Sequence, residues 1–320
     1  MTRPEPARIA RLLRASRNCF IAVHQSPDGD TLGCGLALYS VLKRLGKTAV
    51  VFSVDPVPPS LSFLPYLDKV ILREPPSAKF DTAVLMECST PARAGDVSAV
   101  LEGAKTVINI DHHRTSSKYG TLNYVDKYAS SASEMLYGIF TAMKVRLTRN
   151  EAACLYTGLV TDTGRFHYAV TSPRTHEVAA GLLAAGAPAA KINKQVYDVA
   201  PLSALKVLGL TLANLTLEHK GRTAMSILRL ADMKAVGAVA SDAEGVVNRG
   251  LMVPGVQVSV LFREDAGRIN VNFRSSGRVD VSAIARSFGG GGHKNASGCK
   301  MRLPLGECRR LVLSAIKKSY

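Results

Sequence analysis

The stretch CFIAVHQSPDGDTLGCGLALYSVLKRL, residues 19–45, decides the fold of this chain. It starts as a buried β-strand, passes through the polar segment HQSPDGD and continues as a helix. The same alternation runs to about residue 125, with further strands at TAVVFSV (48–54), DTAVLM (81–86) and TVINI (106–110). Strands alternating with helices indicate an α/β fold with a mostly parallel sheet.

Polar clusters follow three of these predicted strands. HQSPDGD follows CFIAV, ECST follows TAVLM, and DHHR follows VINI. Ligands of open α/β sheets bind beyond the carboxyl ends of the strands. We therefore expect the three clusters to meet at one edge of one sheet.

The second half of the chain has a different pattern. Residues 131–215 are rich in helical segments, whereas strands predominate from residue 222 onward, with EDAG as a hairpin turn between two of them. A helix over residues 281–288, the segment GGGGHKNASG and a final helix complete this part. We predict two α/β domains of unequal size: a larger one over residues 1–195, a helical linker over 196–218 and a smaller one over 219–320.

Charge and cysteine usage restrict the class of protein. The chain has 320 residues, with 41 Lys and Arg against 25 Asp and Glu, a net charge of +16. Such an excess favours anionic partners such as nucleotides, although it also serves solubility alone. The six cysteines are scattered without a CxxC pair, as in proteins of a reducing compartment. With no signal-peptide core and no 20-residue apolar run, we predict a cytoplasmic protein without a membrane partner.

The first polar cluster contains His24, Asp28 and Asp30. Imidazole and carboxylate ligands at this short separation suit a divalent metal such as Mn²⁺, and the two aspartates can face different ions. The alternative is an ordinary turn, because PDGD also supplies backbone hydrogen bonds and a flexible glycine. The cluster alone does not decide between the two interpretations.

The second cluster, Asp111, His112 and His113, is harder to explain as packing. One histidine can bind metal while the other faces substrate as an acid or hydrogen-bond donor, and Asp111 can fix a histidine tautomer. Asp162 in TGLVTDTGRF is by itself more typical of a helix cap or turn. Taken together, a histidine and several carboxylates at strand and helix ends match a two-metal phosphoryl-transfer site.

Phosphate-binding residues are predicted in the second domain. Four consecutive glycines, of which Gly291 and Gly292 directly precede His293, leave exposed backbone N–H groups, and His293, Lys294 and Asn295 add donors. Arg274 beside Ser275 can grip a phosphate with its guanidinium. The alternative is a flexible glycine loop. In the first domain, Arg114 directly after the two histidines is a further phosphate contact.

The segments HQSPDGDTLG, DHH, TDTGRF and FRSSGRVDVSAIARSFGGGGHKNASG resemble the DHH phosphoesterase family over nearly the whole chain. The resemblance implies a DHH domain and a smaller DHH-associated domain, with the active site in the cleft between them and two Mn²⁺ ions, Mg²⁺ or Co²⁺ being alternatives. It assigns His24 and Asp28 to one ion and Asp30, His112 and Asp162 to the other. His113 would face the scissile phosphate, and the second domain would bind the nucleotide.

One position departs from this pattern. After the strand TAVLM the family usually has an aspartate that bridges both metals, and Glu87 stands there. Glutamate keeps the carboxylate on a longer side chain, so it is expected to bridge with altered geometry. Asp81 begins the strand and so lies at its wrong end, and Cys88 is interpreted as a buried thiol.

The expected function follows from the resemblance. It is metal-dependent hydrolysis of very short RNA, of linear dinucleotides or of the 3′-phosphate of pAp. The alternatives are a cyclic-dinucleotide phosphodiesterase, a single-strand DNA exonuclease and, in another class, a catalytically silent nucleotide sensor. A homodimer is compatible with the family, but no surface pattern of the sequence demonstrates one.

Overall fold

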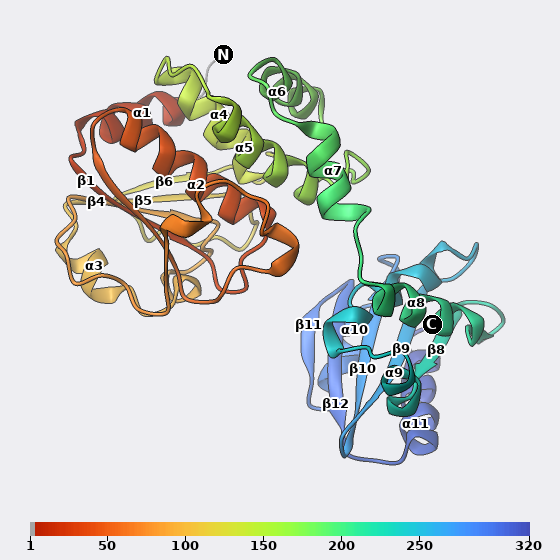
Figure 1. Ribbon diagram of the computed structural model, residues 1–320. Helices are drawn as coiled ribbons and strands as arrows, with labels where there is room; N and C mark the ends of the chain where they lie inside the picture. The colour runs from red at the N-terminus through yellow and green to blue at the C-terminus, as the bar shows by residue number, and fades with distance from the viewer. Residues whose placement is uncertain (1–3) are drawn as a thin grey trace. The chain divides into compact units, whose positions relative to one another are not determined.

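The computed structural model describes residues 4–320 and divides into two compact units, Met1–Val199 and Ala200–Tyr320 (Figure 1). Both are α/β, so the predicted fold class is confirmed. The second unit includes helix α8 (Leu202–Ala213), which packs on β8 (Thr223–Leu228). Each unit is described separately below.

The first unit is built on a six-stranded sheet in the order β3-β2-β1-β4-β5-β6, in which every neighbouring pair is parallel. Its strands are β1 (Asn18–Val23), β2 (Thr48–Ser53), β3 (Val70–Leu72), β4 (Thr82–Met86), β5 (Thr106–Asp111) and β6 (Leu122–Val125). The strand order reverses between β1 and β4. The point of reversal is where open α/β sheets bind ligands.

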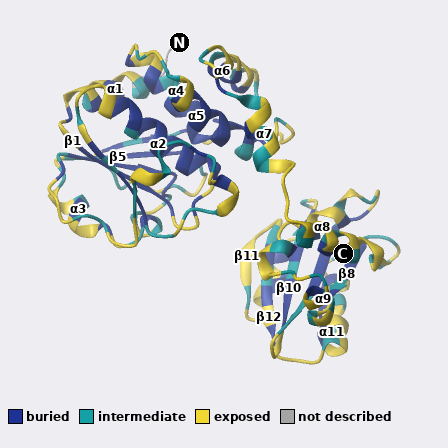
Figure 2. Cartoon of the chain, viewed as in Figure 1, coloured by how far each residue is buried: buried dark blue, intermediate teal, exposed yellow. Residues whose placement is uncertain are grey.

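Both faces of this sheet are covered, as the apolar strand sequences require. Ile21 of β1 belongs to the larger core under the helices, whereas its neighbour Phe20 belongs to a second core on the opposite face with helix α3. Successive strand residues point to opposite faces, so an apolar run such as CFIAV suits a strand buried on both sides. Figure 2 shows the central strands buried and the connecting loops exposed. The helices of this unit are α1 (Pro4–Ala15), α2 (Gly29–Arg44), α3 (Ser98–Gly103), α4 (Ala132–Ala142), α5 (Arg149–Asp162), α6 (Pro173–Ala184) and α7 (Ala189–Tyr197).

Helices α2 and α5 pack against each other at glycines. A Cβ atom on Gly33 would lie 2.3 Å from the carbonyl oxygen of Cys154, and one on Gly158 would lie 2.3 Å from a carboxylate oxygen of Asp30. Both distances are too short for a real contact, so only glycine allows this spacing of the helices. At the other end of α5, Thr148 and Glu151 form a capping box, and Glu151 also pairs with Arg44 of α2.

The second unit has a mixed six-stranded sheet in the order β11-β12-β10-β9-β8-β7. Its elements are α8, β7 (Thr216–Glu218), β8, α9 (Leu230–Ala235), β9 (Val258–Asp265), β10 (Arg268–Ser275), α10 (Val281–Arg286), β11 (Gly291–His293), β12 (Ala296–Met301) and α11 (Leu305–Lys318). Only β8 and β9 pair in parallel, and the other ladders are antiparallel. The EDAG turn predicted from the sequence does join β9 to β10, with Arg268 opposite Asp265.

The glycine-rich segment differs from the expected loop. Gly291, Gly292 and His293 form β11 and pair with β12 in a hairpin. Gly292 has φ +134°, and a Cβ atom on Gly290 would lie 2.2 Å from the carbonyl oxygen of Gly298. These two glycines are therefore needed for backbone conformation and close strand packing, and not only for access to a ligand.

Among the described residues, no single helix is long and apolar enough to cross a bilayer. The successive helices α7 and α8 reach the length and apolar composition of a membrane span only when the residues of both are counted together.

Candidate metal centre

Three strand ends bring the predicted ligands together. Val23 pairs with Met86, which pairs with Ile110, so the next residues along the chain, His24, Glu87 and Asp111, come at matching positions at the carboxyl ends of β1, β4 and β5. The strand-order reversal between β1 and β4 lies at this point of the sheet. The sequence expectation that these clusters share one edge is thereby met.

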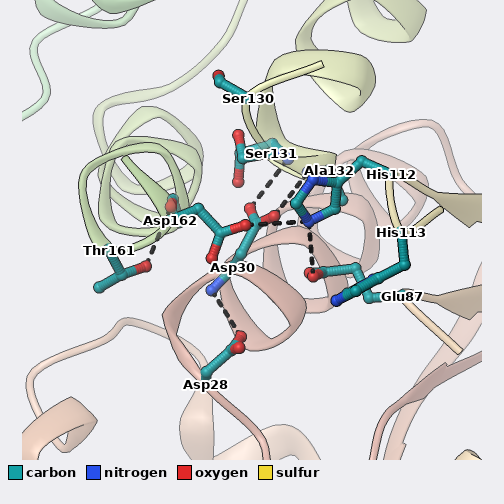
Figure 3. A network of polar contacts seen from close by, with 12 residues as sticks. Asp28, Asp30, Glu87, His112, His113, Ser130, Ser131, Ala132, Thr161 and Asp162 are labelled. Atoms are coloured by element: carbon teal, nitrogen blue, oxygen red, sulfur yellow. Dashed lines mark hydrogen bonds and ion pairs between the residues drawn. The ribbon is translucent and has the colours of Figure 1, made fainter. Parts of the chain in front are cut away.

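Two helix ends supply the remaining carboxylates. Asp28 is the N-cap of α2 and accepts hydrogen bonds from the N–H groups of Asp30 and Thr31, both at 3.1 Å. Asp30 lies in the first turn of the same helix, and Asp162 is the last residue of α5. Both Asp28 and Asp162 therefore hold the helix-end positions that the local sequence favours, and both also lie in the polar cluster (Figure 3).

The side chains form two groups that share Glu87. One contains Asp30, Glu87, His112 and Asp162, and the other contains His24, Asp28 and Glu87; in each group the ligand atoms lie within 4.8 Å of one another. Glu87 also comes within this distance of His112 and His113. His112 Nε2 lies 3.0 Å from Asp162 Oδ2 and 3.4 Å from Glu87 Oε2. Figure 3 shows the carboxylates of Asp30, Glu87 and Asp162 converging around the His112 ring.

Glu87 is an unusual residue in three respects. Its backbone has φ +55°, in the left-handed region that non-glycine residues rarely adopt. Its side chain is 1% exposed, and the Oε1 atom has no hydrogen-bond partner among residues 4–320. Burial and the neighbouring charge of Asp30 raise its pKa well above the ordinary value. A buried carboxylate with an unpaired oxygen is costly unless a cation or donor satisfies it.

The charges around Glu87 point to the same requirement. Burial and the charge of Asp30 raise the pKa of Asp162 to about 7. Burial disfavours the protonated form of His112, but hydrogen bonds to Asp162 and Glu87 outweigh it and raise its pKa to about 11. Crowded carboxylates thus favour a positive charge between them. A divalent cation with oxygen and imidazole ligands fits this set of donors.

The imidazole of His24 is oriented for a ligand role. Its Nδ1 atom lies 2.8 Å from the carbonyl oxygen of Gln25, and Nε2 faces Asp28 Oδ2 at 3.6 Å. Donation from Nδ1–H to the carbonyl leaves the Nε2 lone pair free for a metal. Thr31 donates from its hydroxyl to the carbonyl of Met86 and so ties α2 to β4 beside the cluster.

Asp30 is held by the N-terminus of α4, a feature that sequence reasoning missed. Its Oδ2 accepts from the N–H of Ala132 at 2.6 Å, and its Oδ1 accepts from the N–H of Ser133 at 2.9 Å. Free N–H groups and the helix dipole stabilise a carboxylate at this position. The N-cap pattern around Ser131 indicates a helix start, but no local signal indicates a partner about 100 residues away.

Asp111 and His113 form a separate pair beside the ligands. Asp111 Oδ1 lies 2.7 Å from His113 Nδ1 and accepts from the His113 backbone N–H at 3.0 Å. Burial alone would raise the pKa of Asp111, but the hydrogen bonds, that to the His113 side chain first, bring it below the ordinary value. In this pairing Nδ1–H donates to the Asp111 carboxylate and so orients the half-exposed imidazole, whose Nε2 takes no part in it.

The predicted phosphate contacts of the second unit lie around one corner of its sheet. Arg274 pairs with Ala296, and the N–H of Ser275 donates to the carbonyl of Asn295 at 2.9 Å, so both adjoin the exposed turn of the β11–β12 hairpin that carries His293, Lys294 and Asn295. The Ser275 hydroxyl accepts from the N–H groups of Gly277 and Val279 and thus shapes the turn after β10.

Sequence reasoning did not single out the other polar side chains on the Arg274 face. Asn272 and Arg263 line a hollow of about 440 Å³ together with Arg274. Alternate polar residues in RINVNFR are the signal that could have found Asn272. Burial lowers the pKa of Arg274, whose guanidinium donates to the carbonyl of Phe273 at 2.9 Å.

A parallel α/β sheet with carboxylates and histidines clustered at its strand-order reversal is the arrangement expected of a metal-dependent phosphoesterase. Comparisons with known proteins specify the family. The model of the DHH family N-terminal domain matches residues 18–159, and the DHHA1 domain model matches residues 224–318. The chain belongs to the DHH phosphoesterase family.

Two relatives named bifunctional oligoribonuclease and PAP phosphatase NrnA are similar along most of the chain. The protein from Thermus thermophilus is 34% identical over 97% of this chain and 93% of its own length, and that from Bacillus subtilis is 32% identical over 87% of each. The crystal structure of an exopolyphosphatase-related protein from Bacteroides fragilis superimposes with a TM-score of 0.90 at 25% identity, covering 98% of this chain and 96% of that one.

Proposed function

We propose that this protein is a metal-dependent phosphodiesterase and phosphatase that releases mononucleotides from very short RNA and dephosphorylates pAp. The observation that carries the proposal is the position of Glu87, whose carboxylate belongs to both ligand groups and keeps an unpaired oxygen. The similarity to the two NrnA proteins indicates the substrates.

The proposed centre holds two Mn²⁺ ions, with Mg²⁺ or Co²⁺ as alternatives. His24 and Asp28 would hold one ion, Asp30, His112 and Asp162 the other, and Glu87 would bridge them. Such a pair would lower the pKa of a bound water and offset the negative charge that develops on the phosphoryl and leaving oxygens. Glu87 is longer by one methylene than the aspartate that the family resemblance leads us to expect, and its backbone lies in the left-handed region.

The chain's own residues have three proposed tasks. His113, as the imidazolium, donates from Nε2 to a phosphoryl oxygen as negative charge increases there, while its Nδ1–H donates to Asp111, which orients the ring. Arg114 contacts phosphate from the same loop. In the second unit, Arg274, Ser275 and the glycine hairpin with its turn (Gly291, Gly292, His293, Lys294 and Asn295) bind the nucleotide through donors and positive charge.

The test is mononucleotide release from a labelled RNA trimer in Mn²⁺. Hydrolysis of pAp, a single-stranded DNA 24-mer and cyclic di-AMP is measured in parallel. Asp162→Ala should abolish turnover, because it removes a ligand from one group. Asp68→Ala removes an exposed aspartate whose ion pair within residues 4–320 is with its neighbour Lys69, and it should leave turnover intact.

Each outcome is informative about function. Cleavage of the trimer or pAp that is lost in Asp162→Ala supports the proposal. Preferential cleavage of cyclic di-AMP or of the DNA would replace the proposed substrate with that one. Binding of all four compounds without turnover of any would indicate a silent nucleotide sensor and contradict the proposal.

A further inference from the structure

A groove of about 550 Å³ opens in the first unit beside the candidate metal centre. His113 and Arg114 line it, and so do β6 and the loop that follows this strand, with Lys118, Lys127 and Tyr128. Its volume lies within the range of about 300–1,000 Å³ that is usual for ligand pockets. The groove therefore begins at the residue that would face the scissile phosphate.

The groove is positively charged. Arg114, Lys118 and Lys127 are exposed, and none of them forms an ion pair within residues 4–320. The acidic residues that line it are Glu5 and Asp126. Asp126 is buried and already occupied, since it accepts from the N–H of Tyr128 at 3.2 Å and lies 3.8 Å from Arg174. The three unpaired cations favour an anionic ligand.

Tyr128 gives the groove an aromatic surface. Its side chain is 68% exposed, and the Lys127 ammonium lies 5.1 Å from the ring centroid. The hydrogen bond from its N–H to Asp126 fixes the turn that carries the ring. An exposed ring among cations is the combination with which proteins bind single-stranded nucleic acid, by stacking bases and attracting phosphates.

Building on the proposed function, we propose that this groove binds the part of an oligonucleotide that extends beyond the scissile phosphate, and so sets the preference for substrate length. Lys118 and Lys127 would contact the further phosphates, and a base would stack on Tyr128. An inorganic polyphosphate chain would use the same cations but would gain nothing from the ring. The contribution of Tyr128 therefore distinguishes the two kinds of polyanion.

The experiment measures KM for RNA of two, three and five nucleotides with the full-length protein in saturating Mn²⁺. The double variant Lys118→Gln with Lys127→Gln should raise the ratio of pentamer KM to dinucleotide KM about tenfold. The slope of log(1/KM) against log salt for the pentamer should become shallower by about 1.4, because two fewer phosphates are neutralised.

A matched control removes the same charge elsewhere in the same unit. Lys79 and Lys105 are exposed and form no ion pair within the described residues. Lys79 lies shortly before β4 and Lys105 directly before β5, so both are at the sheet edge opposite the site. Lys79→Gln with Lys105→Gln should leave the KM ratio unchanged. Tyr128→Ala should raise the pentamer KM at least about fivefold, and Tyr128→Phe should retain the wild-type value because it keeps the stacking surface.

The outcomes separate this inference from the proposed function. If the wild type cleaves RNA but the Lys118 and Lys127 variant shows the wild-type KM ratio, the inference about the groove is wrong and the proposed function stands. If the lysines matter and Tyr128→Ala has no effect, the groove binds the RNA through its phosphates alone, and the inference that a base stacks on Tyr128 is wrong. If the wild type cleaves no RNA of any length, the proposed function itself fails.

Discussion

At the scale of single residues, Glu87 connects the two ligand groups. A carboxylate at this position must reach both groups, and the backbone of Glu87 accepts a left-handed conformation to place it there. Such conformations cost about 1–3 kcal/mol and persist where the surrounding structure enforces them. The residue is thus locally unfavourable in backbone and in charge, a combination that is frequent at functional sites.

Replacement of Glu87 by Gln should weaken metal binding without weakening the fold. Gln is isosteric with the protonated acid that the raised pKa of Glu87 favours. Without metal, the melting temperature of the variant should therefore equal or exceed that of the wild type. The rise in melting temperature on adding Mn²⁺ should shrink, and activity should fall at least about 100-fold, because the shared ligand loses its charge. Differential scanning fluorimetry and trimer hydrolysis measure both.

Two comparison variants test the explanation for Glu87. Glu102→Gln changes an exposed glutamate and should alter neither quantity. Glu87→Asp introduces the residue expected from the family resemblance and should keep activity within about tenfold, since aspartate tolerates the left-handed region better. A normal Mn²⁺-dependent stabilisation of Glu87→Gln would contradict the bridging role.

At the scale of elements, the site depends on how closely three helices approach one another. Asp30 of α2 accepts from the N-terminus of α4, and Gly158 of α5 leaves room for its carboxylate. The helices therefore determine the orientation of one ligand before any metal binds. This preorganisation reduces the ordering that binding requires.

Gly158→Ala should weaken metal binding through this packing. Its Cβ atom would lie 2.3 Å from Asp30 Oδ1 and 2.2 Å from the Ser133 hydroxyl, so the helices or the carboxylate must move. We expect the free energy of unfolding to fall by about 1–3 kcal/mol, with a lower melting temperature. Calorimetry should show weaker Mn²⁺ binding.

The control for Gly158 is Gly209→Ala in α8, where the added Cβ meets no atom within 4 Å. Helix propensity alone should then stabilise the protein by about 0.5–1 kcal/mol. Wild-type Mn²⁺ affinity in Gly158→Ala would show that the close approach does not orient Asp30.

The ion pair between α2 and α5 predicts a pH dependence of stability. The buried Glu151 carboxylate accepts from Ser40 and from Arg44 Nε, both at 2.8 Å, and from the N–H of Thr148. Burial opposes ionisation, but hydrogen bonds, that to Arg44 first, bring its pKa below the ordinary value. This stabilisation is therefore present above pH about 4.3 and is lost as pH falls through the lower folded-state pKa.

Glu151→Gln should accordingly be less stable than the wild type at pH 7, by about 1–3 kcal/mol. The difference should shrink below pH about 4.3, where the wild-type carboxylate also takes up a proton. Urea unfolding of both proteins in chelator at pH 7, 5 and 3.5 measures the trend. A difference that stays constant over this range would mean that charge at Glu151 does not contribute.

At the scale of the whole molecule, each unit contains its own cores. Helices and strands of the first unit bury two apolar clusters, and those of the second unit bury two others. The candidate metal ligands all belong to the first unit, whereas the glycine hairpin and Arg274 belong to the second. The proposed metal ligands therefore lie in one unit, whereas the proposed nucleotide contacts lie in both.

Residues 1–199 expressed alone should fold cooperatively and bind Mn²⁺ with an affinity close to that of the full chain. Their KM for an RNA trimer should rise at least about tenfold, because the proposed nucleotide contacts of the second unit are missing. Calorimetry and single-substrate kinetics test both statements. Loss of Mn²⁺ binding in a folded fragment would place a ligand outside residues 1–199.

Much of the fold and of the candidate site could be predicted from the sequence. The run CFIAV and the alternation that follows it predicted the parallel sheet, because apolar strands and intervening helices are local patterns. The positions of His24, Glu87 and Asp111 just beyond their strands predicted one shared edge, since parallel strands all end on the same side. The resemblance to the DHH phosphoesterase family, on the DHH and GGGGH segments, is confirmed by the comparisons.

The sequence by itself thus determined the fold class, the family and the edge of the sheet where the polar clusters meet. Only the tertiary structure decided that Glu87 has a left-handed backbone conformation, that α4 holds Asp30, and that Gly291 to His293 form a strand. It also revealed the groove beside His113. These features depend on contacts between residues far apart in the chain and on strand pairing, and no local pattern of residue types encodes a distance between them.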